Sequence, residues 1–209
     1  MGKLGENMSE KKIFVTGLPR SGSTFIWQCI NKMILEYDGN YTLSRNHGGL
    51  HNQSWDFPIF TCRDIIDVVK SLSITHEISI EEVLKKDFFN DYLTGFLNEH
   101  RYGIVIKYEK YLPHDPELLL HDLNETIFDG NIGPHLISSI AEEYSISNNA
   151  KRASKYKDFS GYDKNGSMIH GKHITSNGFG LGSKISESDK EMIENHPGVR
   201  SYIKVFNSL

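Results

Sequence analysis

The feature that most constrains the fold of this chain is a strand, a glycine-containing loop and a helix within its first 37 residues. Residues 13–16 (Ile-Phe-Val-Thr) are mostly β-branched or aromatic and stop at Gly17, which predicts a short strand. From Ser23 the pattern changes, and apolar residues recur at helical spacing up to about Tyr37. A strand that leads through a short loop into a helix is typical of parallel sheets, so this segment indicates an α/β fold.

The rest of the chain continues this alternation of strands and helices. Further strands are predicted at residues 41–45, 57–62 and 103–108, and helices at residues 64–72, 79–100, 116–128 and from about residue 187. Residues 134–157 are expected to be helical in part, and residues 158–183 to form a loop. This order predicts a three-layer α/β sandwich, in which helices flank a central, mainly parallel sheet. Ligands of such sheets bind beyond the carboxyl ends of the strands.

Length and composition favour one domain. A chain of 209 residues with 38% hydrophobic and 24% charged residues can build one full core and is too short for two comfortable domains. We therefore predict a polar leader over residues 1–11 and a single domain over residues 12–209. Cys29 and Cys62 lie in apolar stretches, which predicts buried thiols in a reducing compartment. With no signal peptide and no apolar run of about 18 residues, a cytoplasmic protein without a transmembrane segment is expected.

The charge is unevenly distributed along the chain. Residues 1–150 contain 13 basic and 21 acidic residues, whereas residues 151–209 contain 10 basic and 6 acidic residues. Non-specific nucleic-acid binding depends on neutralising phosphates, so a chain that is acidic overall is a poor candidate for it, and no nucleic-acid partner is expected. The basic C-terminal part suits a smaller anionic ligand.

The loop after the first strand, Gly17-Leu-Pro-Arg-Ser-Gly-Ser-Thr24, has the G-x-x-x-x-G frame of a P-loop. Ser23 replaces the lysine that normally follows the second glycine, and Arg20 supplies a cation inside the loop. Backbone N–H groups and the start of the helix can still hold an anionic group. Without the lysine, the loop is poorly equipped for the β- and γ-phosphates of a nucleoside triphosphate.

Gly17–Phe25 resembles the 5′-phosphosulfate loop of sulfotransferases that use 3′-phosphoadenosine 5′-phosphosulfate (PAPS). In that family, Lys or Arg and then Ser-Gly-Ser/Thr-Thr follow the first strand. The resemblance implies that PAPS is the sulfuryl donor, that 3′-phosphoadenosine 5′-phosphate (PAP) is the product, and that no metal is required. It also implies that the donor is bound by Arg20, Ser21, Gly22, Ser23, Thr24 and Phe25.

A second segment, Arg63-Asp-Ile-Ile-Asp-Val-Val-Lys-Ser71, follows the predicted strand at residues 57–62. It resembles the family's Arg-Asp-x-x-Asp-Val-x-x-Ser segment, which implies that Arg63 and Ser71 bind the 3′-phosphate. The guanidinium fork of arginine matches a phosphate group, and a hydroxyl adds a donor. An ordinary Arg–Asp pair on a helix surface is the alternative, and the position of the segment after the first loop argues against it.

Weaker similarity extends over most of the chain. Ile104–Glu109 is similar to the family's Arg-Tyr-Glu-Asp-Leu strand, and only Tyr108 is carried over as a ligand candidate; a half-buried strand tyrosine is the alternative. The segment from His173 to Lys184 resembles the glycine-rich loop that closes over the donor. Lys172 and Lys184 are therefore candidates for a second contact with the 3′-phosphate.

Sulfuryl transfer to a hydroxyl needs a general base for the acceptor proton and fixed positive groups at the bridging phosphate oxygen. Arg20 and the N–H groups of its loop can supply the positive groups, which gives Arg20 a catalytic role. Arg45-Asn-His47 follows the predicted strand at residues 41–45 and resembles the family's Lys-Thr-His segment, whose histidine is the base. His47 is therefore the predicted base, with His51 in reserve and Asp56 as a carboxylate alternative.

The sequence thus predicts a PAPS-dependent sulfotransferase that acts on a hydroxyl acceptor, a carbohydrate or a small molecule, by in-line transfer with a histidine base. Two alternatives stay open, a P-loop kinase of a small metabolite and a non-catalytic protein that binds adenosine nucleotides. No metal site is expected, because no Cys/His cluster has zinc spacing and carboxylates are paired only on ordinary helix faces. His170-x-x-His173 is taken as part of the closing loop.

Overall fold

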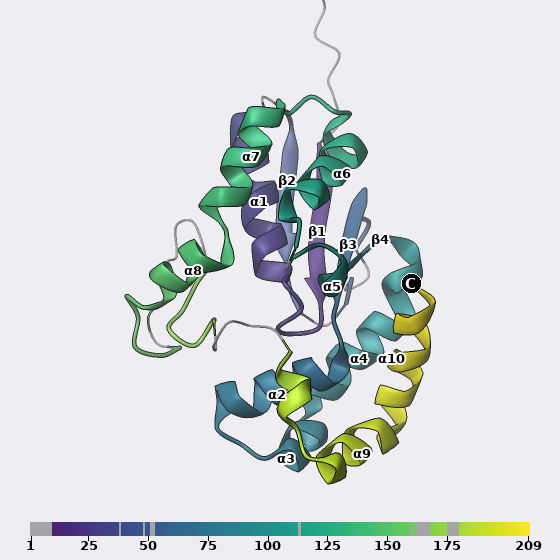
Figure 1. The fold of residues 1–209 in the computed structure, drawn as a ribbon. Coiled ribbons are helices and arrows are strands. Elements are labelled where there is room, and N and C mark those ends of the chain that lie inside the picture. Colours follow the sequence, from purple (N-terminus) through teal and green to yellow (C-terminus); the bar gives the residue numbers. More distant parts are fainter. Residues whose placement is uncertain are drawn as a thin grey trace, which may run out of the picture.

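A computed structural model describes residues 10–37, 39–47, 49–50, 53–112, 114–159, 161, 168–174 and 180–209 of the chain. Most of the predicted leader, and His51, lie outside these residues. The described part has a central parallel sheet with helices on both faces (Figure 1), which confirms the predicted α/β fold class. Within it, no helix has the length and apolar character that crossing a membrane requires.

Four parallel strands make up the sheet of the described residues, in the order β2-β1-β3-β4. Their bounds are β1 (Lys11–Gly17), β2 (Tyr41–Arg45), β3 (Phe57–Cys62) and β4 (Ile104–Lys107). In register, Val15 pairs with Ile59, which in turn pairs with Ile104. From β1 the chain moves to β2 on one side and then to β3 on the other, so the loops after these strands diverge beside β1. This is the position at which parallel α/β sheets bind ligands.

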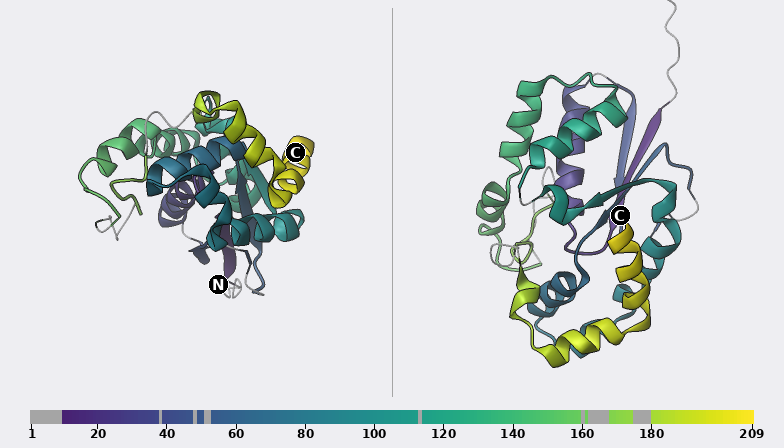
Figure 2. Two further views of the ribbon diagram at one scale, coloured as in Figure 1. Left: turned by 90° about the horizontal axis from the view of Figure 1, so that it is seen from below. Right: turned by 45° about the vertical axis from the view of Figure 1, so that its right-hand side comes forward.

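Helices connect and cover the strands. Their bounds are α1 (Ser23–Glu36), α2 (Ile65–His76), α3 (Ile80–Lys85), α4 (Asp87–Glu99), α5 (Tyr108–Tyr111), α6 (Pro116–Phe128), α7 (Pro134–Glu143), α8 (Ile146–Ala153), α9 (Glu187–Asn195) and α10 (Pro197–Ser208). Short 3-10 turns occur at η1 (His100–Tyr102) and η2 (Leu181–Lys184). Figure 2 shows the C-terminal helices α9 and α10 bordering the half of the molecule that contains α2, α3 and α4.

Two apolar cores lie on the two faces of the sheet. Along β1 and β3, alternate residues face opposite sides, so that Val15 and Ile59 pack against α1, α6 and α7, whereas Phe60 packs against α2, α4 and α10. Cys29 belongs to the first core and Cys62 to the second, and both thiols are free and buried, as predicted. The two cores fix the strands from both sides and so fix the loops at their carboxyl ends.

Two of the predicted helices are each divided into two. The helix expected at residues 79–100 begins with a capping box of Ser79 and Glu82, but it ends at Lys85 and restarts at Asp87, because the backbone of Lys86 is extended. The helix expected from residue 187 onward breaks before Pro197, since proline has no N–H to continue a helix and disfavours helical backbone in the residue before it.

The phenol of Tyr202 anchors helix α10 to the end of β3. Its ring is fully buried, and its hydroxyl donates to the Arg63 carbonyl at 2.7 Å and accepts from the Arg63 N–H at 3.0 Å. Both backbone groups of Arg63 are therefore satisfied by a single side chain 139 residues away in the sequence. The first residue after β3 is held in place by the C-terminal helix.

We expect Tyr202→Phe to lower the free energy of unfolding by about 1–3 kcal/mol, because the substitution removes a buried hydroxyl that bonds both the N–H and the carbonyl of Arg63. Urea unfolding followed by circular dichroism measures this change. Tyr102→Phe is the matched control, since the Tyr102 ring is 61% exposed and its hydroxyl accepts from the exposed Arg101 side chain. Equal stability of Tyr202→Phe and wild type would contradict the anchoring role of this hydroxyl.

Candidate functional site

A cavity of about 770 Å³ opens at the carboxyl edge of the sheet. Most of the residues predicted from the sequence line it: Arg20, Gly22, Ser23, Thr24, Phe25, His47, Arg63, Ser71 and Tyr108. They come from the loops and helices that follow all four strands. The parallel sheet therefore brings together motifs that are up to 88 residues apart in the sequence.

The loop between β1 and α1 directs the start of α1 toward the cavity. Arg20 and Gly22 have positive φ angles of 67° and 91°, and a methyl group at Gly22 would collide with the Leu112 side chain. Gly22 is the N-terminal cap of α1, where no side chain caps the helix and no acidic residue lies in the first turn. The positive end of this 14-residue helix is thus directed at the cavity without a compensating carboxylate, which is suited to an anion.

Ser21 does not line the cavity, although the sequence predicts a donor-binding role for it. Its buried hydroxyl donates to the Leu18 carbonyl and lies 2.6 Å from the Thr61 hydroxyl of β3. Its N–H also donates to the Leu18 carbonyl, at 3.3 Å. Ser21 therefore attaches the loop to strand β3 of the sheet. Its position in the motif does not tell whether its side chain faces the cavity or the sheet.

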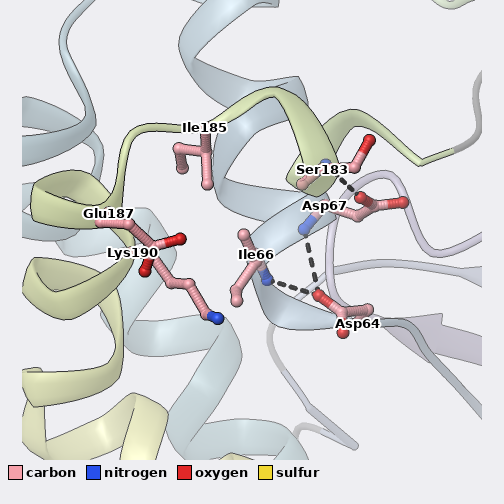
Figure 3. Close-up of a pocket in the computed structure, with 8 residues that line it drawn as sticks. Asp64, Ile66, Asp67, Ser183, Ile185, Glu187 and Lys190 are labelled. Carbon is pink, nitrogen blue, oxygen red and sulfur yellow. Dashed lines mark hydrogen bonds between the residues drawn. The ribbon is translucent and has the colours of Figure 1, made fainter.

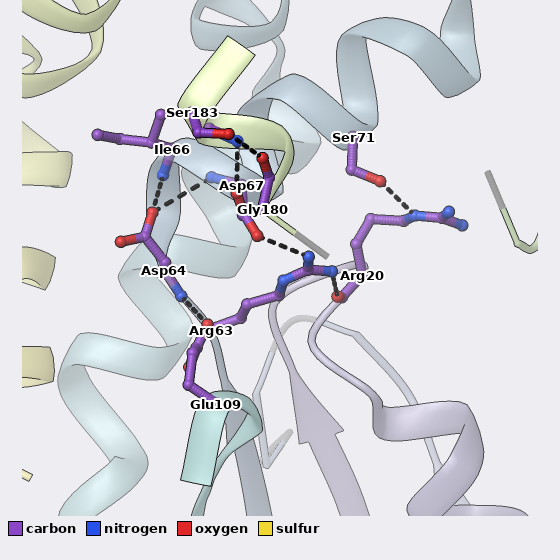
Figure 4. A network of polar contacts seen from close by, with 10 residues as sticks. Arg20, Arg63, Asp64, Ile66, Asp67, Ser71, Glu109, Gly180 and Ser183 are labelled. Atoms are coloured by element: carbon purple, nitrogen blue, oxygen red, sulfur yellow. Dashed lines mark hydrogen bonds and ion pairs between the residues drawn. The ribbon is translucent and has the colours of Figure 1, made fainter. Parts of the chain in front are cut away.

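The side chains of Arg20 and Arg63 form one network in which each contacts a different partner (Figure 4). Arg20 donates from Nε to the Ser71 hydroxyl at 2.9 Å. Arg63 donates from Nη1 to the Arg20 carbonyl at 3.1 Å, which holds Arg20 in its left-handed conformation. Burial, followed by the nearby Arg63 charge, lowers the pKa of Arg20 to about 10, so Arg20 stays charged near neutral pH.

Arg63 is only 4% exposed, and a neighbouring carboxylate balances its charge. Its Nη2 pairs with the Asp67 carboxylate at 2.8 Å, and its guanidinium lies 4.5 Å from the centre of the Tyr108 ring. The other oxygen of Asp67 accepts from the N–H of Gly182 at 2.6 Å. The pair predicted to bind the 3′-phosphate, Arg63 and Ser71, therefore lines one cavity, with Arg20 bonded to the serine and Asp67 to the arginine.

His47 lies directly after β2, at the position that the sequence predicts for the base. Its Nδ1 is 3.1 Å from the Gly17 carbonyl, and its Nε2 is 3.2 Å from Nη2 of Arg45. A carbonyl can only accept and a guanidinium can only donate, so the proton of the neutral ring is on Nδ1 and the free electron pair is on Nε2. The ring also packs against Tyr92, with 5.4 Å between the ring centres.

Burial and then the charge of Arg45 lower the pKa of His47 to about 4, and the hydrogen bond to Gly17 opposes them. The imidazole is therefore neutral near pH 7, with an electron pair available at Nε2. The sequence indicates Arg45 only as the cation before the histidine and does not predict that it bonds the histidine ring. Its contact with Nε2 is visible only in the structure.

Three other candidates lie away from the cavity lining. The ammonium group of Lys172 pairs with the Glu77 carboxylate at 2.6 Å, and Lys184 lies in η2, which packs against the first part of α2. Asp56 accepts from the Lys12 N–H at 2.8 Å and lies just before β3. That position is at the amino edge of the sheet, opposite the cavity, so Asp56 is too far along the strand to serve as the alternative base.

One wall of the cavity is a continuous series of aromatic rings, which we call the aromatic belt. Neighbouring ring centres are 4.8–5.8 Å apart. In order of contact, the belt consists of His47, Tyr92, Phe88, His76, Phe159, His170 and His173. Helical periodicity of residues 79–100 accounts for two of these rings as core residues, and nothing in the sequence shows that the others join them.

The cavity is positively charged. Arg20, Arg45 and Arg63 line it, and none of its described lining residues is acidic. Across the described parts of the chain, no group of three or more His, Cys, Asp or Glu side chains could hold a metal ion. The arrangement can therefore bind an anion through guanidinium groups, hydroxyls and a helix start.

A second, smaller pocket of about 300 Å³ lies at the start of α2, beside η2 and α9 (Figure 3). Asp64, Asp67 and Glu187 line it together with Lys190. Asp64 caps α2 by accepting from the N–H groups of Ile66 and Asp67, so its carboxylate is already bonded within the protein. The described lining of this pocket has more acidic than basic side chains, which is the opposite of the main cavity.

Comparison with known proteins agrees with the fold. The structure is similar to that of mouse sulfotransferase SULT7A1, solved in complex with PAP, with a TM-score of 0.62 and 14% sequence identity over 88% of this chain and 82% of that one. No protein-family model matches the chain, and no curated protein matches its sequence. The structural match shows that this chain has the sulfotransferase fold.

We expect His47 to stay neutral until the pH falls to about 4. Arg45→Gln removes a cation and should raise this pKa while leaving it below 6.5, because burial is the larger cause. An NMR titration of the histidine ring protons measures both values. The folded pKa is below that of the unfolded chain, so His47 should also make the free energy of unfolding decrease as the pH falls from about 6.5 to 4. A pKa of His47 near 6.5 in the wild type would contradict the buried hydrogen-bonded geometry.

Proposed function

We propose that this protein is a PAPS-dependent sulfotransferase, which transfers a sulfuryl group to a hydroxyl acceptor. The observation that carries the proposal is the combination, in one cavity whose described lining has no carboxylate, of the uncapped start of α1, the Ser71–Arg20–Arg63 network and the neutral His47. The similarity in fold to a sulfotransferase solved with PAP supports it.

The donor has two anionic ends, and the cavity has a group of donors for each. On this proposal, the start of α1, with Ser23, Thr24 and Arg20, binds the 5′-phosphosulfate through N–H groups, hydroxyls and a guanidinium. Ser71 and Arg63 line the same cavity, each in contact with Arg20, and bind the 3′-phosphate. Arg20 bonds the Ser71 hydroxyl, so one guanidinium is placed between the two ends.

The transfer step forms a bond from the acceptor oxygen to sulfur and breaks the bond from sulfur to the bridging phosphate oxygen. Nε2 of His47 takes the acceptor proton, and the bonding electrons of the broken bond stay on PAP. Arg20 and the N–H groups of its loop stabilise the negative charge that grows on the phosphate. Because Arg45 donates to the same electron pair of His47, the acceptor hydroxyl must displace Arg45, whose guanidinium is then available to the sulfuryl oxygens.

The aromatic belt begins at His47, so the acceptor meets it first. Tyr92 and Phe88 come next along the belt, on one side of α4. An apolar or ring-bearing hydroxyl compound can bury a face against these rings, whereas a carbohydrate needs several polar partners. Polar side chains other than the proposed donor ligands, such as Ser145 and Asn149, also line the cavity, but the surface next to His47 is formed by aromatic rings. Of the acceptors that the sequence left open, the cavity favours a small ring-bearing alcohol or phenol.

Two measurements test the function. Isothermal titration calorimetry should show that PAP binds more tightly than ATP, and incubation with PAPS should give a sulfated product from 2-naphthol rather than from glucose, with EDTA present throughout. Loss of a guanidinium that bonds a buried phosphate costs about 2–5 kcal/mol, so Arg20→Gln should weaken PAP binding by at least tenfold. Arg101→Gln, on the exposed η1 turn, is the matched control.

Other results would point to other functions. Tight binding of ATP only with Mg²⁺, and phosphate transfer from it, would indicate a kinase. Tight PAP binding without any sulfated product from either acceptor would leave a nucleotide-binding protein. Unchanged PAP affinity in Arg20→Gln would show that the loop after β1 does not bind the donor.

We expect His47→Asn to lower turnover by roughly 10²–10⁴-fold, the range for removal of a general base. PAP affinity should remain within a few-fold of wild type, since on this proposal Nε2 faces the acceptor and not the nucleotide. His121→Asn, on the exposed side of α6, is the control for loss of an imidazole. Full turnover in His47→Asn would exclude this residue as the base.

A further inference from the structure

The short segment 168–174 borders the cavity and is held there by contacts at both of its sides. The Lys172 carbonyl accepts from Nη1 of Arg20 at 3.3 Å, while its ammonium group pairs with Glu77 at the end of α2. The N–H of Gly171 donates to the Asp158 carbonyl at 3.0 Å. The segment is therefore bonded to the proposed donor loop. Contacts with residues far away in the sequence, as well as its own backbone, hold it beside the cavity.

Two imidazoles of this segment, those of His170 and His173, line the cavity with unused polar atoms. Their ring centres are 4.8 Å apart, and they are the last two rings of the aromatic belt, which begins at His47. The Nδ1 atoms of both rings are shielded from solvent and have no hydrogen-bond partner among the described residues. A shielded nitrogen without a partner destabilises a protein, so two side by side in one cavity require an explanation.

Burial and the charges around the two rings keep both imidazoles neutral near pH 7. Arg20 faces them from the loop after β1, Arg45 and His47 from the end of β2, and His76 from the end of α2. Burial and then Arg20 lower the pKa of His170 to about 4, and the same two causes come first in holding the pKa of His173 well below its usual range. The Glu77 carboxylate nearby is already paired with Lys172.

We propose that His170 and His173 form an additional anion-binding element of this cavity, which takes up protons when a polyanionic ligand such as a phosphosulfated nucleotide binds. This inference rests on the proposed function for the identity of the ligand. The charge of an anion in the cavity offsets the two arginines, and its oxygens can accept from ring N–H groups. Both effects favour the imidazolium form, in which each ring has two N–H donors.

Proton uptake predicts how affinity depends on pH. In the free protein the two rings are neutral, and in the complex they hold protons, so the complex is the more protonated state. Affinity for the anion should therefore rise as the pH falls, by about tenfold per pH unit for each proton taken up. The dependence ends where the rings become protonated in the free protein as well.

The experiment compares wild type with His170→Gln/His173→Gln, in which amides keep hydrogen-bonding groups but cannot be protonated near neutral pH. Calorimetric titration with PAP in two buffers of different ionisation enthalpy gives the number of protons taken up. We expect wild type to take up more protons than the double variant, and its affinity to fall more steeply between pH 6 and pH 8. His121→Gln, on α6 and outside the cavity lining, should behave as wild type.

PAP also changes its own protonation on binding, and so can His47 and His76. These contributions are shared by wild type and double variant, so the difference between the two proteins isolates the pair. Equal proton uptake and equal affinity in both proteins would overturn the inference while leaving the proposed function intact.

Pyrophosphate, which lacks the adenosine, is the second probe and separates the two proposals. If pyrophosphate causes the histidine-dependent proton uptake and PAP does not bind, the anion-binding pair stands and the proposed function fails. If the double variant does not fold, NMR titration of wild type decides, with single variants to assign the ring signals. The pKa values of both rings must then rise when PAP or pyrophosphate is added, and unchanged values would overturn the inference.

Discussion

The arrangement of the cavity depends on the contacts of one buried arginine. The backbone N–H and carbonyl of Arg63 both bond the hydroxyl of Tyr202, which places α10 behind the end of β3. Its side chain donates to the Arg20 carbonyl and to the Asp67 carboxylate, and this carboxylate also accepts from the N–H of Gly182. Three segments far apart in the sequence thus share one anchor. A substitution at Arg63 would keep its backbone bonds to Tyr202 but would remove the side-chain bonds to the Arg20 carbonyl and to Asp67, so Arg20 is the cleaner position at which to measure the contribution of a guanidinium to ligand binding.

Positive charge determines the chemistry of the cavity, whose described lining includes three arginines and no acidic side chain. The Asp67 carboxylate pairs with Arg63, whereas the contacts given above for Arg20 and Arg45 are with a hydroxyl, a carbonyl and an imidazole. Like charges held close in a desolvated space raise the free energy of the cavity and keep neighbouring imidazoles neutral. An anionic ligand relieves both effects, so the charge distribution of the cavity favours binding one.

The parts of this structure that the sequence predicted are those governed by local rules. The bounds of β2 and β3 and the loop around Arg20 follow from apolar runs and glycine positions within a few residues of each other. The sequence pattern does not predict the helix break at Lys86, because the amphipathic spacing of apolar residues continues across it. The aromatic belt joins side chains from separate parts of the chain, and Ser21 turns inward to Thr61 on another strand. Contacts of this kind depend on tertiary packing, for which one sequence carries no local signal.

The same positive charge that attracts a donor also controls the proposed base. In the empty cavity, burial and Arg45 make His47 a weak base, with a pKa of about 4. On the proposed function, a bound donor adds several negative charges near Arg20 and Arg45, which raises the pKa of His47 toward the value at which a base works best near neutral pH. An acceptor that enters without the donor therefore meets a weak base whose electron pair is still bonded to Arg45. Proton removal from the acceptor is thereby favoured only when a sulfuryl group is present to receive the oxygen.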